Sequence, residues 1–260
     1  MKFLKHKLNV VVVAGASGIG LEIVKAYLEE ECRLFVCDIS STFLEELSQS
    51  HPEVFTQRTN VAIYDEVKEF FDHVKKEVDH IDVLINCAGI AGPTGHLQDL
   101  DPKAWDLTIA ININGMFYCI KECIPLLKQS KSPSIINLAS NAAFFGFPLR
   151  SPYATSKWAT IGLTKTVAME LGVDHVRVNA ICPGSVRGER IDRVVAADAK
   201  AQNKSIEEIE ELYCRQVSMK TFVEASDVAH LALFLSSDYG RFISGQAIGL
   251  DGHTEGLSNS

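Results

Sequence analysis

The chain has 260 residues, 47% hydrophobic and 22% charged, a composition typical of a globular protein with one substantial core. Its formal net charge is −8 and its basic residues form no cluster, so we expect neither nucleic acid nor an anionic membrane as a partner. No apolar run approaches the roughly 20 residues that span a bilayer, and we expect no secretory signal because the first residues are too polar. The seven scattered cysteines include no C-x-x-C pair, so they predict free thiols in a reducing cytoplasm rather than a disulfide or metal scaffold.

Strand and helix patterns alternate through the first half of the chain. A β-branched run at 8–13 predicts a buried strand, and a glycine-rich turn and a helix over 18–30 follow it. The other expected elements of this half are strands at 33–37, 54–57 and 81–85 and helices over 63–78 and 102–128. We expect the last of these helices to bend before Pro125, which lacks a backbone N–H.

The second half continues the alternation, with strands at 134–138, 176–180 and 247–250 and a helix over 152–171. This order predicts an α/β fold, a doubly wound parallel sheet of seven strands with helices on both faces. No Pro/Ser-rich linker divides the chain, so residues 1–260 are expected to form one dinucleotide-binding catalytic domain. The charged, helical segment 187–222 is expected to form a substrate lid at the carboxyl edge, where open α/β sheets bind ligands.

Residues 14–20, A-G-A-S-G-I-G, join the first strand to its helix and favour binding of a pyrophosphate. Gly15, Gly18 and Gly20 let the backbone approach phosphate oxygens, and the helix N-terminus adds N–H donors. Asp38 ends the second strand, where its carboxylate would accept from both ribose hydroxyls of NAD and repel a 2′-phosphate. The alternatives are an ordinary strand–helix turn and a solvated aspartate.

Tyr153 and Lys157 are four residues apart in Y-A-T-S-K, and Ser140 lies thirteen residues before the tyrosine. On a helix, the phenol and the ammonium share one face, and the ammonium lowers the pKa of the phenol. A tyrosine so tuned can exchange a proton with an alcohol or ketone, while Ser140 bonds the same oxygen. Taken alone, such a pair is also common on helix surfaces.

In this order and spacing, these residues resemble the short-chain dehydrogenase/reductase family over nearly the whole chain, from Leu8 to Gly252. The segments that carry the resemblance are Val13–Gly20, Asn86–Gly89, Asn112 in N-I-N-G-M-F, the Ser140, Tyr153 and Lys157 set, Pro183–Gly184 and residues 244–253. The departures are Val13 and Ala14 for Thr and Gly, Cys87 for Asn, Asn60 for Asp, and Gly188 for Thr.

The resemblance implies the cofactor NAD, a catalytic set of Ser140, Tyr153, Lys157 and Asn112, and a homotetramer built on the long helices. Asn112 would hold a water that links Lys157 to solvent, and Lys157 would also bind the nicotinamide ribose. The residues expected to bind the cofactor are Gly15, Ser17, Gly18, Ile19, Gly20, Asp38, Asn60, Val61, Asn86, Ala88, Gly89, Tyr153, Lys157, Pro183, Gly184 and Val186.

The residues expected near the substrate are Arg150, Arg187, Arg190, Phe145 and His96. An arginine suits a carboxylate, sulfonate or phosphate through its bidentate fork. The alternative for the last two arginines is pairing with Glu189 or Asp192 in a solvated lid. Phe145 equally suits core packing, and His96 equally suits an exposed loop.

The sequence therefore predicts an NAD-dependent oxidoreductase acting on the secondary alcohol or ketone of a small polar, anionic or sugar-like molecule, without a metal. One alternative is a 3-oxoacyl-[acyl-carrier-protein] reductase. Asp38 disfavours it because such enzymes usually prefer NADPH, and the acidic chain shows no basic patch for the acidic helix of the carrier. Another is a catalytically idle NAD-binding sensor, which would not need the complete proton-transfer set.

Overall fold

The computed structural model describes residues 3–257 and contains a parallel sheet of seven strands in the order β3-β2-β1-β4-β5-β6-β7. The strands are β1 Asn9–Val13, β2 Arg33–Asp38, β3 Phe55–Arg58, β4 Val83–Asn86, β5 Ser134–Leu138, β6 Arg177–Pro183 and β7 Ala247–Leu250. All seven strands lie where the sequence predicts them, within a few residues at each end. The predicted fold class is therefore confirmed.

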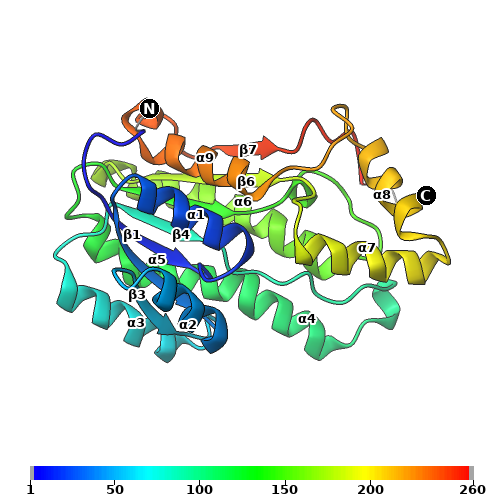
Figure 1. Ribbon diagram of the computed structural model, residues 1–260, viewed down its shortest axis with the longest axis horizontal. Coiled ribbons are helices and arrows are strands. Elements are labelled where there is room, and N and C mark those ends of the chain that lie inside the picture. Colours follow the sequence, from blue (N-terminus) through cyan, green and yellow to red (C-terminus); the bar gives the residue numbers. More distant parts are fainter. Residues whose placement is uncertain (1–2, 258–260) are drawn as a thin grey trace.

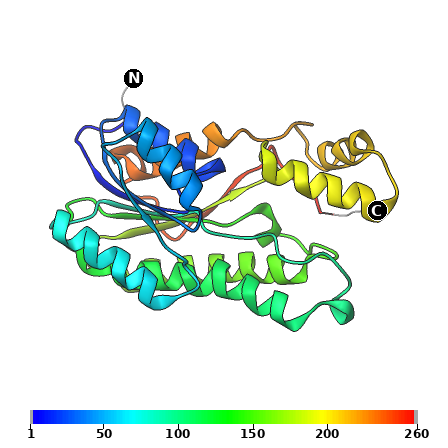
Figure 2. The ribbon, with the colours of Figure 1, turned by 60° about the horizontal axis from the view of Figure 1, so that its bottom comes forward.

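Helices cover both faces of the sheet (Figures 1 and 2). The helices are α1 Gly18–Glu29, α2 Ser41–Ser50, α3 Tyr64–Glu77, α4 Pro102–Ile109, α5 Gly115–Leu127, α6 Ser151–Leu171, α7 Glu189–Gln202, α8 Ile206–Arg215 and α9 Ala225–Ser236. Alternate strand residues point to opposite faces. Val10 and Val12 thus pack with α1, α2 and α9, whereas Val11 and Val13 pack with α3, α5 and α6.

The helix expected over 102–128 is irregular in a different place from the one predicted. A π-helical turn, η2 (Ala110–Asn114), separates α4 from α5, whereas Pro125 lies inside α5 near its C-terminal end. The predicted bend before Pro125 is not the break that the structure shows. A single π-helical turn of this kind often marks a functional position, and this one contains Asn112.

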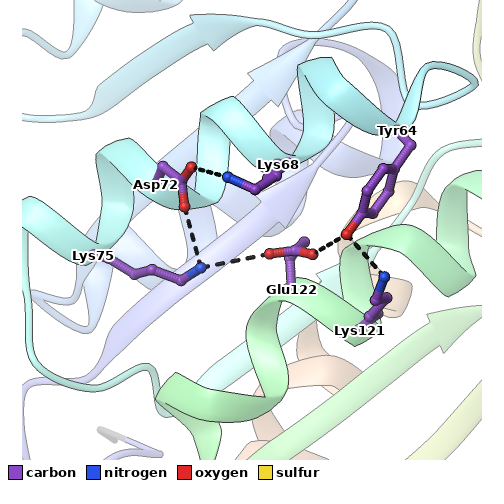
Figure 3. A network of polar contacts seen from close by, with 6 residues as sticks. All are labelled: Tyr64, Lys68, Asp72, Lys75, Lys121 and Glu122. Carbon is purple, nitrogen blue, oxygen red and sulfur yellow. Dashed lines mark hydrogen bonds and ion pairs between the residues drawn. The ribbon is translucent and has the colours of Figure 1, made fainter.

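A polar network on the surface ties α3 to α5 (Figure 3). The Tyr64 hydroxyl donates to Glu122 Oε1 at 2.7 Å and accepts from Lys121 Nζ at 2.8 Å. Lys75 bridges Glu122 and Asp72, at 3.5 and 3.3 Å. Because Glu122 of α5 is mostly buried and its partners Tyr64 and Lys75 both lie on α3, the network helps to fix α5, whose preceding turn holds Asn112.

The expected lid consists of α7 and α8, which pack on each other through Val195, Ala199 and Ile209. Figure 1 shows both helices at the end of the molecule toward which the β7 arrow points. The strands of a parallel sheet all point the same way, so α7 and α8 lie at their carboxyl edge, and their role as a substrate lid stays a prediction.

Candidate active site

The strand order reverses between β1 and β4, and this reversal opens a crevice at their carboxyl ends. Val13 pairs in register with Cys37 of β2 and with Asn86 of β4. The segments that follow these three residues therefore meet at one place. The Cys87 N–H donates to the Val13 carbonyl at 3.0 Å, and the Ala14 N–H donates to the Cys37 carbonyl at 2.7 Å.

The glycines of the turn between β1 and α1 allow close backbone packing there. A Cβ added at Gly20 would lie 2.1 Å from the Ala14 carbonyl oxygen, and one at Gly15 would lie 2.9 Å from side-chain methyls of Val12 and Val36. Gly18 instead has a φ of +51°, which favours glycine. The side chain of Ser17 makes no capping hydrogen bond to α1, and Ile19 is half-buried beside it. The turn therefore fits a pyrophosphate.

Ala14 occupies the place of the family's first glycine and adopts φ +57°. This left-handed conformation costs an alanine roughly 1–2 kcal/mol and costs glycine little. We expect Ala14→Gly to raise the free energy of unfolding by about 1 kcal/mol. Denaturant unfolding measures it. The matched control is Ala16→Gly in the same turn, where φ is not positive, which should lower stability by about 0.4–1 kcal/mol. If both variants lose the same free energy of unfolding, Ala14 is not strained.

Asp38 is buried beneath this turn, with both carboxylate oxygens engaged. Its Oδ2 accepts from the Ala16 N–H at 3.2 Å and its Oδ1 from the Ser40 N–H at 3.1 Å. The carboxylate is thus fixed at the end of β2, next to the glycine-rich turn. An acceptor in this position suits the ribose hydroxyls of a dinucleotide.

Asn60 and Val61 follow β3 on the same side of the crevice. Asn60 Oδ1 accepts from the Ala62 N–H at 3.1 Å, and its own N–H donates to Glu66 Oε2 at 2.7 Å. Val61 is buried against Gly115 at the start of α5, where an added Cβ would lie 2.8 Å from a Val61 methyl. These contacts hold the segment as a rigid wall at the expected adenine end.

Three of the four predicted catalytic side chains come from α6 and from the N-cap of the short helix η3 (Asn141–Ala143) after β5, two elements that pack together. Lys157 is 3% exposed, and its Nζ donates to the Leu138 carbonyl at 2.7 Å. The same Nζ lies 5.6 Å from the centroid of the Tyr153 ring. Ser140 is buried as the N-cap of η3, where its Oγ accepts from the Ala142 N–H at 3.2 Å.

Asn112 is fully buried and connects the loop after β4 to α6. Its Oδ1 accepts from the Ile90 N–H at 2.8 Å, and its Nδ2 donates to the Ile90 carbonyl at 3.0 Å and to Ser156 Oγ at 2.9 Å. Ser156 in turn donates to the Tyr153 carbonyl at 2.7 Å. The side chain thus locks the Tyr153 helix to the loop.

Gly89 and two cysteines define the surroundings of the Lys157 ammonium. A Cβ added at Gly89 would lie 3.4 Å from Asn112 Oδ1 and 3.5 Å from Lys157 Nζ. Burial raises the pKa of the Cys87 and Cys182 thiols to about 12, and the Lys157 charge opposes both shifts. Lys157 therefore lies among the ends of β4, β5 and β6, and the two thiols stay protonated and unreactive at neutral pH.

Asn86, expected to bind the cofactor, is buried beneath the crevice. Its Nδ2 donates to Asn137 Oδ1 at 2.9 Å, and Asn137 Nδ2 donates to Thr164 Oγ1 at 3.0 Å. This chain of amides joins β4 and β5 to α6. Asn86 therefore supports α6 from below, while Ala88 and Gly89 belong to the loop above it.

The segment after β6 closes the far side of the crevice. A Cβ added at Gly184, after the buried Pro183, would lie 2.9 Å from Asp251 Cβ. At the bridge of Val186 with Val223, the hydrogen bonds are made by Ser185 and Arg187, so the N–H and C=O of Val186 point away from Val223. Such a backbone fits the expected carboxamide contact.

Gly188, where many family members carry threonine, has a φ of +132° at the start of α7. A side chain with a Cβ rarely adopts this conformation, which gives a physical reason for the departure. The lid therefore begins with a backbone turn that a threonine would strain.

Arg150 is the one predicted substrate arginine whose described side chain is buried, at 7% exposure. Its Nη1 donates to Thr94 Oγ1 at 2.6 Å, and its guanidinium lies 5.9 Å from the Phe147 ring centroid. Burial and the Asp198 carboxylate raise the pKa of Tyr213 on α8, and the Arg150 charge opposes this shift. Arg150 thus lies near the lid, and no carboxylate within residues 3–257 is recorded in an ion pair with it.

The other expected substrate residues lie differently. Arg187 is 56% exposed, pairs with Glu224 at 3.7 Å, and stacks 4.8 Å from the Phe222 ring centroid. Its partner is thus neither Glu189 nor Asp192. Phe145 is half-buried, with its carbonyl accepting from Trp158 Nε1 at 3.4 Å, and His96 is exposed. The side chain of Arg190 lies outside the described part of the chain.

Sequence reasoning missed several residues that the structure places at the site. Ser156 lies inside Y-A-T-S-K, so its spacing from Tyr153 was a usable signal. Thr94, Asn141 and Thr254 carry no comparable local signal. Among the described residues, no group of His, Cys, Asp or Glu is arranged to hold a metal ion. Within residues 3–257, no helix is both long and apolar enough to cross a membrane.

Comparison with known proteins agrees with this geometry. The family model described as Enoyl-(Acyl carrier protein) reductase matches residues 13–254. Dehydrogenase/reductase SDR family member 6 of Aquarana catesbeiana is 33% identical over 244 residues, covering 94% of this chain and 95% of the relative. The 3-oxoacyl-[acyl-carrier-protein] reductase FabG of Staphylococcus epidermidis is 34% identical over 247 residues, covering 93% and 96%.

Two solved structures share the whole fold. Ligand-free aldohexose dehydrogenase of Thermoplasma acidophilum superposes with a TM-score of 0.84 at 29% identity, covering 98% of this chain and 95% of the other. A single-residue variant of actinorhodin polyketide ketoreductase with NADPH superposes with a TM-score of 0.89 at 27% identity, covering 98% of both chains. The chain belongs to the short-chain dehydrogenase/reductase family. It is therefore an oxidoreductase with a nicotinamide cofactor.

Proposed function

We propose that the protein is an NAD-dependent dehydrogenase or reductase acting on the secondary alcohol or ketone of a small anionic molecule. The observation that carries this proposal is the buried Lys157 ammonium, 5.6 Å from the Tyr153 ring, on the helix beside Ser140. An idle sensor could use this ammonium to bind a ribose, but it would not need a phenol held beside it.

The roles of the side chains follow from their chemistry. When bound, the nicotinamide exchanges a hydride with the carbinol carbon of the substrate. Tyr153 takes the proton of an alcohol or gives one to a ketone, and the nearby ammonium of Lys157 favours the phenolate. Ser140 holds the substrate oxygen. The Leu138 carbonyl and the wall at Gly89 fix the Lys157 ammonium where it serves both the phenol and a ribose.

In this proposal, the side chain of Asn112 has a positioning role. Its amide is engaged by Ile90 and Ser156, so it holds the Tyr153 helix against the loop that carries Gly89. A water linking Lys157 to solvent beside Asn112 remains a prediction.

Asp38 supports a preference for NAD(H) over NADP(H). Its buried carboxylate at the end of β2 would repel a 2′-phosphate, and the turn at 14–20 supplies no arginine or lysine to offset this. We expect kcat/KM to be higher with NAD⁺ than with NADP⁺. The variant Asp38→Asn keeps a hydrogen-bonding group but loses the charge, so it should lower the ratio of the two kcat/KM values. Steady-state kinetics with both cofactors measures it. A parent enzyme that prefers NADP⁺ would contradict this preference, and the ketoreductase neighbour was solved with NADPH.

Arg150 supports an anionic substrate. A buried guanidinium with no carboxylate partner recorded among the described residues is costly unless another anion completes its hydrogen bonds. Arg150 comes three residues before Tyr153 and lies near the lid through Tyr213, so we propose that it binds the carboxylate of a substrate whose carbinol reacts at Tyr153.

A substrate panel tests the proposed function. Hydroxy acids, neutral secondary alcohols, sugars and 3-hydroxyacyl thioesters are offered with NAD⁺ and NADP⁺, and reduced nicotinamide is followed by absorbance. We expect turnover of hydroxy acids with NAD⁺. Faster turnover of the thioesters would favour an activity like that of the FabG relatives. Tight NAD binding without turnover of any compound would favour a sensor.

We further infer that the chain forms a homotetramer through the helices that carry the catalytic residues. Among the apolar residues of α6, Val167 is buried, whereas Trp158 and Met169 are 53% and 84% exposed and share one helix face. Leu107 and Phe117, on α4 and α5, are 52% and 48% exposed. Apolar exposure on adjacent helices is typical of an interface.

The expected assembly is a tetramer by light scattering at micromolar concentration. Trp158→Glu should shift the mass toward smaller species, since it would bury a charge in the interface. The control Ile206→Glu changes a similarly exposed residue on the lid, at 51%, and should leave the mass unchanged. A monomeric parent protein would refute the inference. We also infer a cytoplasmic location, because all seven cysteines are free thiols and five of them are buried.

A further inference from the structure

Ser140 is one end of a buried hydrogen-bond chain that reaches the C-terminal segment. Its Oγ donates to Asn141 Oδ1 at 3.2 Å, and Asn141 Nδ2 donates to Thr254 Oγ1 at 3.0 Å. Asn141 and Thr254 are 8% and 4% exposed. The backbone of Thr254 is fixed by an antiparallel bridge to Val217, which follows the lid helix α8. The end of this hydrogen-bond chain at Thr254 is therefore held in place by the backbone.

In this arrangement, the Ser140 hydroxyl donates its single proton to Asn141, whereas the reaction needs that proton to be donated to the substrate oxygen. A hydroxyl has one donor and two acceptor sites. The donor is directed at Asn141, and one acceptor site takes the Ala142 N–H. A substrate ketone oxygen accepts only, and a substrate alcohol gives its own proton to Tyr153. Ser140 must therefore donate to the substrate oxygen in both directions of the proposed reaction.

Rotation of the Asn141 amide by half a turn resolves this conflict without moving any other heavy atom. The oxygen and nitrogen of the amide exchange places, and both positions keep their neighbours. In the rotated state, Nδ2 donates to Ser140 Oγ and Oδ1 accepts from the Thr254 hydroxyl. Both acceptor sites of Ser140 are then filled, its proton is free for the substrate, and donation from the amide makes the hydroxyl a stronger donor.

We propose that Asn141 is a positioning residue that, through its hydrogen bond with Thr254, sets the Ser140 hydroxyl as a donor toward the substrate oxygen. The substrate itself drives the amide rotation, because its oxygen binds only the state in which the Ser140 proton is free. The inference rests on the proposed function for the role of Ser140. Asn141 acts only through Ser140 and touches neither reactant.

The first test is Asn141→Asp, which keeps the shape of the side chain. An ionised carboxylate only accepts, so it retains the Ser140 proton and cannot adopt the rotated state. We expect kcat to fall roughly 10- to 100-fold, the cost of breaking a hydrogen bond to a charged acceptor. Cofactor affinity by calorimetry should stay near that of the parent enzyme, and the variant should remain folded at the assay temperature. An unchanged kcat would overturn the proposal.

Thr254 supplies a matched pair of variants. Thr254→Val removes the hydroxyl but keeps the shape, and should lower kcat about 3- to 10-fold with little change in KM. Thr254→Ser keeps the hydroxyl and should restore most of the rate. If both variants behave alike, the hydroxyl has no such role and the proposal is wrong.

A double-mutant cycle separates positioning from any independent effect. Asn141→Asp in a Ser140→Ala background should cost nothing further, because the group through which Asn141 acts is gone. If it costs the same factor as in the parent enzyme, the proposal is overturned. The cycle also distinguishes the two levels of inference. A Ser140→Ala variant with near-normal turnover would instead contradict the proposed catalytic set.

Discussion

Tyr153→Phe is expected to lower kcat by roughly 10²–10⁴-fold, the usual contribution of general acid–base catalysis. The variant keeps the ring that lies 5.6 Å from Lys157 Nζ and removes only the hydroxyl that exchanges the proton. Packing should survive, since Tyr153 is half-buried at the start of α6 and its carbonyl still accepts from Ser156. Turnover with saturating cofactor measures the effect.

The control for this variant is Tyr118→Phe, another half-buried tyrosine, which lies on α5 and packs edge-on against Tyr64. Its turnover should match that of the parent enzyme. Cofactor affinity should be unchanged in both variants, because neither alters Asp38, Lys157 or the glycine turn. Near-normal turnover by Tyr153→Phe would show that another group moves the proton.

Arg150→Gln is expected to have the next largest effect, and only on anionic substrates. If Arg150 binds a substrate carboxylate, its loss leaves that charge unpaired in a covered site, and kcat/KM should fall roughly 30-fold or more. Neutral alcohols should be affected far less. The ratio of kcat/KM for a hydroxy acid to that for a neutral alcohol measures the change, independently of any general damage to the enzyme.

Arg187→Gln is the matched control, because Arg187 is 56% exposed and already paired with Glu224. Exposed pairs contribute little, so the ratio should stay near that of the parent enzyme. If the two arginine variants reduce the ratio equally, or if Arg150→Gln affects acids and neutral alcohols alike, Arg150 does not recognise the substrate anion.

The seven strands and their order in the chain were predictable from the sequence because their signals are local, whereas the catalytic set and the role of the lid stay predictions. Four β-branched valines form β1, and the helical spacing of Tyr153 and Lys157 fixes their common face. Few folds were then compatible with the pattern, since regular alternation of strands and helices leads to a parallel sheet that binds its ligand at the carboxyl edge.

The features that escaped prediction depend on contacts between distant segments. Residues 110–114, A-I-N-I-N, carry no sequence signal for a π-helical turn, whereas Pro125 predicted a break because proline lacks a backbone N–H. Asn112 is bonded to Ile90, 22 residues earlier, and to Ser156, 44 residues later. The Asn141–Thr254 bond spans 113 residues, so neither residue could be linked to Ser140 from spacing.

The lid gives a further example of this limit. The acidic neighbours Glu189 and Asp192 made local pairs with Arg187 plausible, yet its partner is Glu224, just before α9. Glu189 pairs instead with Arg193, one helical turn on, at 3.6 Å. The partner of a long surface side chain is decided by the path of the backbone, which single-sequence patterns do not contain.

Hydride transfer itself is the most direct test of the proposed function. A secondary hydroxy acid carrying deuterium on its carbinol carbon is incubated with NAD⁺ and the parent protein, and the reduced cofactor is analysed by mass spectrometry. We expect one deuterium in the reduced nicotinamide for each molecule of ketone formed, and none with Tyr153→Phe over the same time. Reduced cofactor without deuterium, or equal transfer by Tyr153→Phe, would contradict a dehydrogenase in which Tyr153 moves the proton.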